Sequence, residues 1–280
     1  MNLRTILHVS LLFSFLTAVV MTTNAQENEF VFNKKVNYQV TFLSDSTDEN
    51  SRQTMPAELL LNDTNSLFWF LNKSIKDEEL AKPNAFPSPS IGFAPGLVNN
   101  ENYVILKNKD GEITVYDEYS GSDLRKLMQI NVYKERINPE DWQLTEETDT
   151  VMGLAVQKAV LQFGGRTWEA FFAPELPIAD GPYKFNGLPG LILRIQDRTK
   201  SWVFEAQDIK EVDQKVVVNN KKELKIVPIE KKELYSQRRK FQQDQVFARQ
   251  GEGDGGIESA ENRKQAEERI KKDNNWIELN

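Results

Sequence analysis

The strongest conformational constraint in this 280-residue chain is the run from Gly181 to Leu193, which reads GPYKFNGLPGLIL. Its first ten residues hold three of the chain's 14 glycines and two of its 11 prolines. Glycine reaches backbone angles that other residues avoid, whereas proline fixes φ and removes an N–H donor. A segment of this composition specifies one backbone path, and the neighbouring elements have to fold around it.

Alternation of apolar and polar residues predicts strands on both sides of this run. The pattern is clearest over 30–43, where Val36, Tyr38 and Val40 alternate with polar residues. Residues 108–111 (Asn-Lys-Asp-Gly) form a strong hairpin signal. Further strands are expected at 58–61, 66–71, 102–106, 112–118, 127–137, 155–163, 167–173, 190–196, 202–208, 212–218 and 223–228, the last two as a hairpin through Asn219-Asn220. The sequence therefore predicts a mainly β (α+β) fold, an antiparallel meander of roughly ten strands.

The C-terminal region has a different composition. Residues 230–250 and 259–272 are rich in charged side chains and predict two helices, which the glycine-rich stretch 251–256 separates. In the first helix Leu234, Phe241 and Val246 lie on one side, as in a helix that packs a thin apolar stripe on a sheet. We therefore divide the chain into a signal peptide (1–25), an antiparallel β domain (26–229) and a charged helical C-terminal region packing on the sheet (230–280).

The N-terminus has the pattern of a secretory signal. Arg4 precedes an apolar stretch over 6–21, and the small residues up to Ala25 suit cleavage after that residue. We expect an exported protein, periplasmic or extracellular and outer-membrane associated, with no transmembrane segment after cleavage. Loss of residues 1–25 removes one charge, Arg4, so the net charge changes from −7 to −8. This acidic balance argues against nucleic acid as a partner.

The same cleavage removes the chain's single histidine, His8, and the chain contains no cysteine. The mature protein therefore lacks the imidazole and thiol groups on which Ser-His-Asp and Cys-His catalysis and ordinary zinc sites depend. Any reaction would have to use carboxylates, Lys, Tyr or hydroxyl groups. We therefore predict no catalytic residue, no cofactor and no metal, and favour a protein without enzymatic activity.

Four segments around the run resemble the GLPGLI family of exported Bacteroidetes proteins: 153–159, 165–170, 174–178 and 181–192. The match is specific over about 153–208. It implies a cell-envelope protein of unassigned activity. The chain is also distantly similar to a bowl-shaped, non-catalytic N-terminal domain of some type II peptide-N-glycosidases. That resemblance implies a curved sheet, bowl-like or half-barrel, and a role in binding or positioning.

The run itself favours a structural role for its motif residues, which are Gly181, Pro182, Gly187, Leu188, Pro189 and Gly190. Pro189-Gly190 suits the centre of a type II turn, with glycine at positive φ, which leads into a core strand. The alternative is a loop that rims a shallow pocket, for which we name Trp168, Tyr183, Phe185 and Arg166 as candidate binding residues.

Cationic residues bracket the run at Lys158, Arg166, Lys184 and Arg194. They could bind a carboxylate or a sulfate group, but a solvated face is the favoured interpretation. Arg166 follows Gly165 in a predicted hairpin turn, so we expect its side chain to be exposed.

Three functions remain open. The first is non-enzymatic binding of an unknown ligand or an outer-membrane partner, as an accessory of a TonB-dependent transport system for example. The second is a carboxylate-dependent glycan hydrolase that uses Glu175, Asp180 or Asp197, because paired carboxylates cleave glycosides without histidine. Carboxylates in loops are usually solvated or cap turns, and the favoured interpretation of Asp180 and Asp197 is that they accept turn hydrogen bonds. The third is a periplasmic lipid carrier.

Overall fold

The structure is a computed structural model that describes residues 28–71, 103–117, 129–218, 225–248, 264, 268, 271–272 and 274–279. The predicted signal peptide, the stretch 251–256 and most of the second predicted helix lie outside the described residues. In the described parts, no helix has the length and apolar character needed to cross a membrane.

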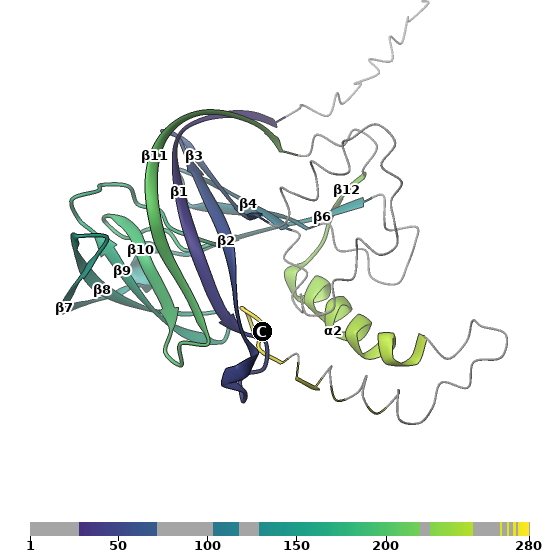
Figure 1. The fold of residues 1–280 in the computed structure, drawn as a ribbon. Helices are drawn as coiled ribbons and strands as arrows, with labels where there is room; N and C mark the ends of the chain where they lie inside the picture. The colour runs from purple at the N-terminus through teal and green to yellow at the C-terminus, as the bar shows by residue number, and fades with distance from the viewer. Residues whose placement is uncertain are drawn as a thin grey trace, which may run out of the picture.

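The described strands form one 12-stranded sheet in the order β12-β6-β5-β4-β3-β2-β1-β11-β10-β9-β8-β7 (Figure 1). Every neighbouring pair is antiparallel except β12 and β6, and the sheet is open between its edge strands β12 and β7. The predicted mainly β, antiparallel architecture is thus confirmed. The strands are β1 (Asn28–Leu43), β2 (Arg52–Leu61), β3 (Asn65–Phe70), β4 (Tyr103–Asn108), β5 (Glu112–Asp117), β6 (Gln129–Arg136), β7 (Gln143–Val151), β8 (Leu154–Phe163), β9 (Arg166–Ala173), β10 (Leu191–Asp197), β11 (Trp202–Val218) and β12 (Lys225–Pro228).

The sheet consists of two meanders, β1 to β6 and β7 to β11, joined by the long antiparallel pair β1 and β11. The sequence predicts a break within β11, and this prediction is wrong. Lys210 and Glu211 remain in the strand because they pair with β1, where Glu211 forms an ion pair with Lys34. The predicted hairpin of 212–218 with 223–228 is also wrong, since β12 pairs in parallel with β6.

Strand β7 is absent from the sequence prediction. Its residues are exposed or half-buried up to Thr150, and only Val151 is buried. As an edge strand it pairs with β8 alone, so its backbone is hydrogen-bonded while its side chains meet solvent. Without an apolar face there is no period-two signal to detect.

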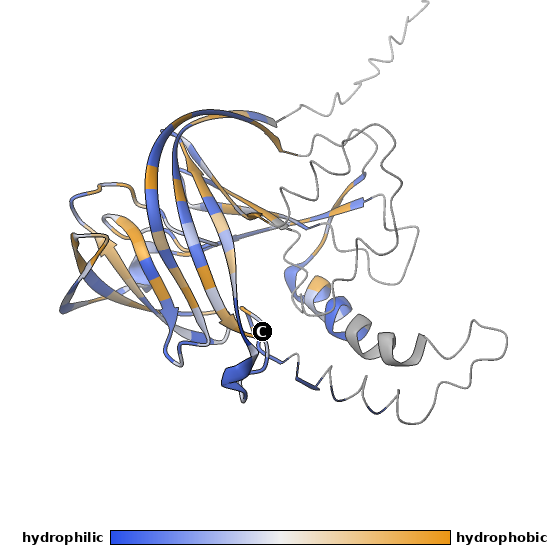
Figure 2. Cartoon of the chain, viewed as in Figure 1, coloured by the Kyte–Doolittle hydropathy of each residue, from blue (hydrophilic) through white to orange (hydrophobic). Residues whose placement is uncertain are grey.

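The main core lies on one face of the sheet, as the alternating hydropathy along the strands in Figure 2 illustrates. On β2 and β3, Leu59 and Phe68 belong to this core, whereas Leu60 and Leu67 belong to a smaller cluster with Phe32. Because successive side chains in a strand point to opposite faces, the two clusters lie on opposite sides of the sheet.

The inner face is filled by the loop of residues 174–190 between β9 and β10, which we call the motif loop. Phe185 of this loop packs on Trp168 of β9 with ring centroids 4.7 Å apart. The same residue offers its carbonyl to Lys107 of β4, with Nζ at 3.4 Å. In a flat sheet six strand spacings would place β4 and β9 about 29 Å apart. Both strands contact one residue, so the sheet curves around the loop.

Helix α2 (Lys231–Ala248) follows β12 and confirms the helix expected over 230–250. Leu234 and Tyr235 are buried in the main core, and the hydroxyl of Tyr235 lies 3.4 Å from that of Tyr133 on β6. The side chains of Phe241 and Val246 lie outside the described residues. Two short 3-10 helices, η1 (Glu49–Ser51) and η4 (Pro139–Asp141), complete the described elements.

Candidate functional site

The glycines of the motif loop serve backbone geometry. Gly187 has a φ of 93°, whereas Gly190 is not among the residues at positive φ, so the predicted type II turn with left-handed glycine is not found there. A Cβ on Gly190 would lie 2.3 Å from the carbonyl oxygen of Ala173. Leu191 pairs with Ala173 at the start of β10, which presses this part of the loop against β9. Glycine is therefore needed for close packing rather than for φ.

Lys107 of β4 fastens the start of the motif loop. Its side chain is 2% exposed, donates to the carbonyl of Gly181 at 2.6 Å and forms an ion pair with Asp180. Burial lowers the pKa of Lys107, and Asp180 offsets only part of this effect. Asp180 also accepts a hydrogen bond from the backbone N–H of Gly181 at 2.7 Å. This carboxylate therefore holds the loop in place.

The three predicted aromatic residues are all buried. Trp168 and Phe185 pack against each other in the core with tilted rings, and the indole N–H of Trp168 donates to the carbonyl of Phe163 at 3.0 Å. They do not form the shallow surface that the sequence suggested, because the sheet curves around them. Tyr183 differs, since its hydroxyl donates a hydrogen bond to Glu278 near the C-terminus.

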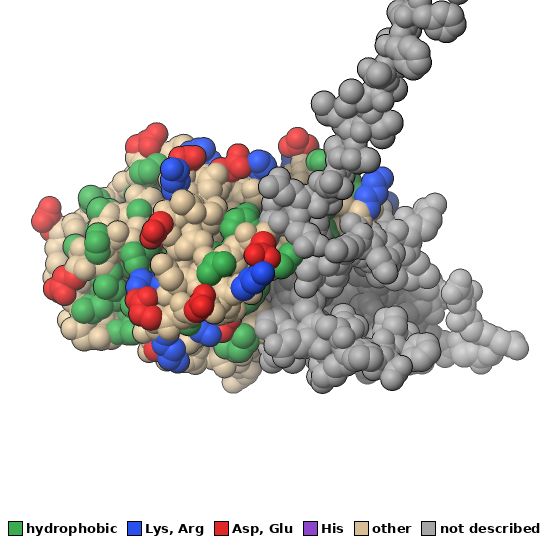
Figure 3. Space-filling model, turned by 90° about the horizontal axis from the view of Figure 1, so that it is seen from above, with side chains coloured by type: hydrophobic (Ala, Val, Ile, Leu, Met, Phe, Trp, Pro, Cys, Tyr) green, Lys and Arg blue, Asp and Glu red, His purple; other side chains and the backbone are tan. Residues whose placement is uncertain are grey.

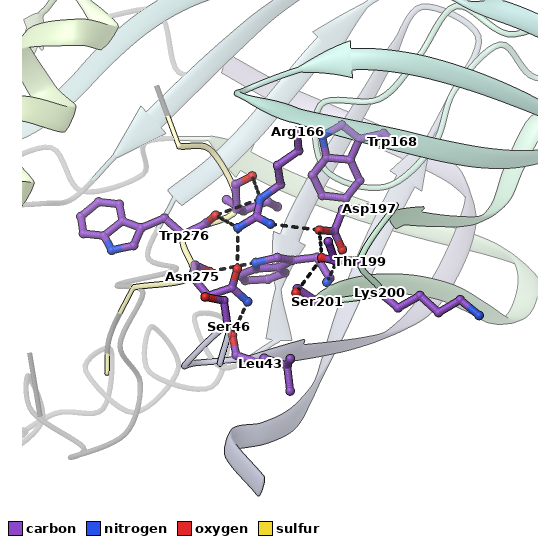
Figure 4. A network of polar contacts seen from close by, with 12 residues as sticks. Leu43, Ser46, Arg166, Trp168, Asp197, Thr199, Lys200, Ser201, Asn275 and Trp276 are labelled. Atoms are coloured by element: carbon purple, nitrogen blue, oxygen red, sulfur yellow. Dashed lines mark hydrogen bonds and ion pairs between the residues drawn. The ribbon is translucent and has the colours of Figure 1, made fainter. Parts of the chain in front are cut away.

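Residues 274–279, which we call the tail segment, lie against the predicted binding residue Arg166 (Figure 4). The Arg166 side chain is 7% exposed, so the expected exposure is wrong. Its Nη1 lies 3.0 Å from Asp197, and its Nε lies 3.1 Å from the carbonyl oxygens of Trp276 and Ile277. The tail segment covers the Arg166 side chain, which was expected to meet solvent.

The β domain holds the tail segment through both its backbone and its side chains. The indole N–H of Trp202 donates to the carbonyl of Asn275 at 2.9 Å, and the backbone N–H of Leu279 donates to the carbonyl of Gly164 at 2.7 Å. Together with Arg166, these groups bind three consecutive carbonyls and one N–H of the segment. Asn275 adds a side-chain hydrogen bond to the carbonyl of Leu43 at 2.6 Å.

Glu278 enters a buried polar pocket, and its side chain is 0% exposed. Lys184 of the motif loop donates to its Oε1 at 2.5 Å, and Lys231 of α2 forms an ion pair with Oε2. The Tyr235 hydroxyl lies 3.2 Å from Oε1. We define the Glu278 pocket by the six side chains that surround this carboxylate: Tyr133, Glu135, Tyr183, Lys184, Lys231 and Tyr235.

The charges in the Glu278 pocket stabilise one another. Burial by itself raises the pKa of Glu278, but the ammonium groups of Lys184 and Lys231 outweigh it and lower this pKa from 4.5 to about 2. Burial by itself lowers the pKa of Lys184, and the charge of Glu278 outweighs it, so this pKa lies well above 10.5. A lysine that stays protonated cannot act as a nucleophile or a general base. The pocket is therefore suited to binding a carboxylate.

A cavity of about 20 Å³ lies beside Glu278. Its walls include the Glu278 pocket residues Tyr133 and Lys184 as well as Asp117 and Arg238, which are ion-paired at 2.5 Å. This volume has room for about one water-sized group. The tail segment therefore nearly fills the space between β6, the motif loop and α2.

The three candidate hydrolytic carboxylates have separate surroundings. Glu175 is exposed, Asp180 is paired with Lys107, and Asp197 accepts from Arg166. Asp197 also accepts from the Trp202 backbone N–H at 2.8 Å, as expected for a turn acceptor. Over the described ranges, no group of three or more His, Cys, Asp or Glu residues could hold a metal ion.

The other two bracketing cations lie on the sheet. Lys158 pairs with Glu169 at 3.2 Å, and Arg194 pairs with Asp149 at 2.5 Å. Asp and Glu side chains are interspersed with Lys and Arg on the face drawn in Figure 3. The solvated-face interpretation is wrong for Arg166 and Lys184, whose side chains are buried against carboxylates.

Sequence reasoning missed Glu278, Lys231 and the tyrosines on β6 and α2. No sequence motif links these residues to the motif loop, and only the fold brings them close to Lys184. Two signals could have marked the site. Lys184 lies between aromatic residues in the glycine- and proline-rich run, and Glu278 lies between Ile277 and Leu279.

Comparisons with known proteins agree with the fold and leave the activity open. The model of the Porph_ging family, a protein family of unknown function, matches residues 130–194, which include the motif loop. Two solved structures of PNGF-II, in space groups P21 and C2, are similar with TM-scores of 0.50 and 0.49 at 16% identity, over 75% of this chain. The chain spans about a third of the length of those PNGF-II chains (34% and 33%). No curated protein matches it.

Proposed function

We propose that the chain is an exported GLPGLI-family protein of the cell envelope that binds a ligand or an outer-membrane partner on the inner face of its curved sheet. The run Gly187–Ile192, which spells the family motif, falls within the region matched by the family of unknown function. The N-terminal sequence supports export, because it combines Arg4, an apolar stretch and a small-residue cleavage site.

One observation carries this proposal. The inner face of the sheet holds a peptide segment through donors to its backbone carbonyls and a pocket for one side chain. Backbone hydrogen bonds that give affinity and a pocket that gives specificity are the elements of peptide recognition. The positive and negative side chains in this site are paired with one another, and Lys184 stays protonated. The arrangement supports binding rather than turnover.

A ligand screen tests the proposal. The mature protein is mixed with peptides, glycans and lipids, and the thermal unfolding midpoint is measured for the wild type, for Arg166→Gln, and for Arg198→Gln as an exposed control in the neighbouring turn. A ligand of this site raises the midpoint of the wild type and the control, but not that of Arg166→Gln.

Two results would contradict the proposal. One is that no ligand class shifts the midpoint and no envelope protein is retained by the wild type and lost with Arg166→Gln. The other is glycan hydrolysis that Glu175→Gln, Asp180→Asn or Asp197→Asn abolishes, which would establish the hydrolase alternative. Copurified acyl chains would instead support a lipid carrier.

A further inference from the structure

We infer that the Glu278 pocket is a recognition site for acidic peptides and that the tail segment is its internal ligand. This inference rests on the proposed binding function and adds the ligand class. The predicted ligand is a segment in which an aliphatic residue directly precedes Glu, as Ile277 precedes Glu278, where the tail segment bends. Such a segment of a partner protein competes with the tail segment for the same pocket.

The first step concerns the backbone. Arg166 and the indole of Trp202 donate to the carbonyls of residues 275–277, and the carbonyl of Gly164 accepts from the N–H of Leu279. These contacts do not depend on which side chains the bound segment carries. Another peptide that follows the backbone path of the tail segment, with its bend at Ile277, can therefore make them. Asp197 keeps the Arg166 guanidinium in position at 3.0 Å.

The second step concerns charge. The Glu278 pocket contains the ammonium groups of Lys184 and Lys231 and the carboxylate of Glu135, which forms ion pairs with both. Asp117 and Arg238, which line the adjacent cavity, form a neutral pair. Counted over the described residues, the pocket without Glu278 therefore has a net charge of +1, and Lys184 is 1% exposed. A buried excess cation strongly favours an anionic partner.

The third step concerns the shape of the anion. Lys184, Tyr183 and Tyr235 converge on Oε1, while Lys231 binds Oε2. Three donors at one oxygen and an ammonium group beside the other match a planar carboxylate. A neutral amide would place its NH2 group against the Lys231 ammonium. Ile277 is buried beside this carboxylate, whereas Leu279 is 47% exposed. Selectivity therefore falls on the Ile-Glu pair rather than on the residue after it.

Because the tail segment is covalently attached, it determines the concentration that an added peptide needs to occupy the pocket. A tethered segment competes at an effective concentration in the millimolar range. An acidic peptide therefore binds weakly to the intact wild type and tightly once the tail segment is weakened. This predicts that a change in Glu278 itself increases binding of a peptide added in solution.

The test uses the full mature chain and a fluorescent peptide with the sequence of residues 274–280, Asn-Asn-Trp-Ile-Glu-Leu-Asn. Anisotropy titrations compare the wild type with Glu278→Gln. We expect the variant to bind this peptide at least about 10-fold more tightly than the wild type. A peptide with Gln in place of Glu should bind at least about 30-fold more weakly than the acidic peptide.

A matched pair of helix variants locates the binding. In the Glu278→Gln background, Lys231→Met should reduce affinity for the acidic peptide about 10-fold or more, and Lys232→Met, an exposed neighbour on α2, should leave it unchanged. As a second measurement, a protease site placed at 251–256 is cleaved, and the labelled peptide should then displace the severed fragment. This keeps the test valid if Glu278→Gln is poorly folded.

Three outcomes would overturn the inference. They are equal binding of the acidic and amide peptides, no peptide binding by a folded Glu278→Gln or cleaved chain, and occupation of the pocket only by the tail of a second copy, seen as a dimer without peptide binding. If a different ligand class raises the unfolding midpoint of the wild type in these cases, the proposed binding function survives and the ligand class is wrong.

Discussion

At the residue scale, Gly190 shows how the motif acts on packing. A Cβ at this position would lie 2.3 Å from the carbonyl oxygen and 2.7 Å from the carbonyl carbon of Ala173, both of which are backbone atoms. Backbone in a central strand cannot move aside as a flexible side chain can. A methyl group here therefore has to push the motif loop away from β9.

We predict that Gly190→Ala lowers the free energy of unfolding by about 3 kcal/mol through this overpacking. Gly153→Ala is the control, because a Cβ there meets nothing within 4 Å and only the positive φ of 78° is strained. That strain costs about 1–2 kcal/mol. Urea unfolding of both variants measures the difference, and a loss for Gly153→Ala equal to that for Gly190→Ala would disprove the packing argument.

Also at the residue scale, Tyr183 has a φ of 54°, a left-handed conformation that is unusual for a residue with a large side chain. Its ring packs 6.4 Å from that of Phe204 and its hydroxyl binds Glu278. Such local strain persists only where surrounding contacts determine the conformation. It directs Tyr183 toward the Glu278 pocket while Phe185 turns into the core.

At the scale of elements, Lys107 joins β4 to the motif loop across the inside of the sheet. Lys107→Met would leave the Asp180 carboxylate and the carbonyl of Gly181 without their cation. We predict a loss of about 3 kcal/mol in the free energy of unfolding, as for other buried ion pairs with one partner removed. Lys109→Met in the exposed β4–β5 turn is the control.

The double variant Lys107→Met with Asp180→Asn sharpens this prediction. It removes the unpaired charge, so it should recover part of the stability that Lys107→Met loses. Chemical denaturation of the four proteins completes a double-mutant cycle. If Lys107→Met and Lys109→Met cost the same, or if the losses at 107 and 180 simply add, the ion pair does not fasten the loop.

Also at the scale of elements, the strands show which parts of the fold the sequence could predict and which it could not. Strands with a buried face, such as β1, β8 and β9, have a period-two pattern and lie close to their predicted positions. Strand β7 lacks that pattern because one edge strand can be held by backbone pairing alone. The parallel pair of β12 with β6 depends on a partner nearly 100 residues away, which no local pattern reports.

The residues of the candidate site also divide into those that the sequence could predict and those that it could not. Arg166 and Tyr183 could be named in advance because they lie beside the glycine- and proline-rich run. Lys231 could not, and Glu278 is marked only by its apolar neighbours, since the roles of both arise when α2 and the tail segment meet the motif loop. Buried charges carry no signal in a single sequence, where a solvated lysine and a buried one look alike.

At the scale of the whole molecule, the sheet is open at its edges, and the motif loop and tail segment fill its inner face. The two meanders are joined in the sheet through β1 and β11. Glu278 adds a second link, because Lys184 of the motif loop binds it and also contacts Tyr133 and Glu135 of β6. The charge of Glu278 therefore affects the stability of the assembled fold rather than that of one element.

This link predicts a pH dependence of stability. Because the folded pKa of Glu278 is about 2 and its ordinary value is 4.5, the carboxylate contributes fully above about pH 4.5 and loses its contribution as the pH falls toward 2. A shift of this size corresponds to about 3 kcal/mol. The pKa of Lys184 is raised, so its contribution is complete below 10.5 and is lost only at higher pH. Between about pH 4.5 and 10.5 both groups therefore contribute fully, and their contribution to stability does not change with pH.

Glu278→Gln isolates this contribution from that of the other carboxylates. It should lower the free energy of unfolding by about 3 kcal/mol at pH 7, while the difference from the wild type should shrink toward zero near pH 2, where Glu278 becomes protonated. Glu112→Gln is the control, since its pair with Lys134 lies on the surface and contributes about 0–1 kcal/mol. Urea unfolding between pH 2 and 8 measures all three proteins. A constant difference between the wild type and Glu278→Gln over that range would show that the charge of Glu278 does not stabilise the fold.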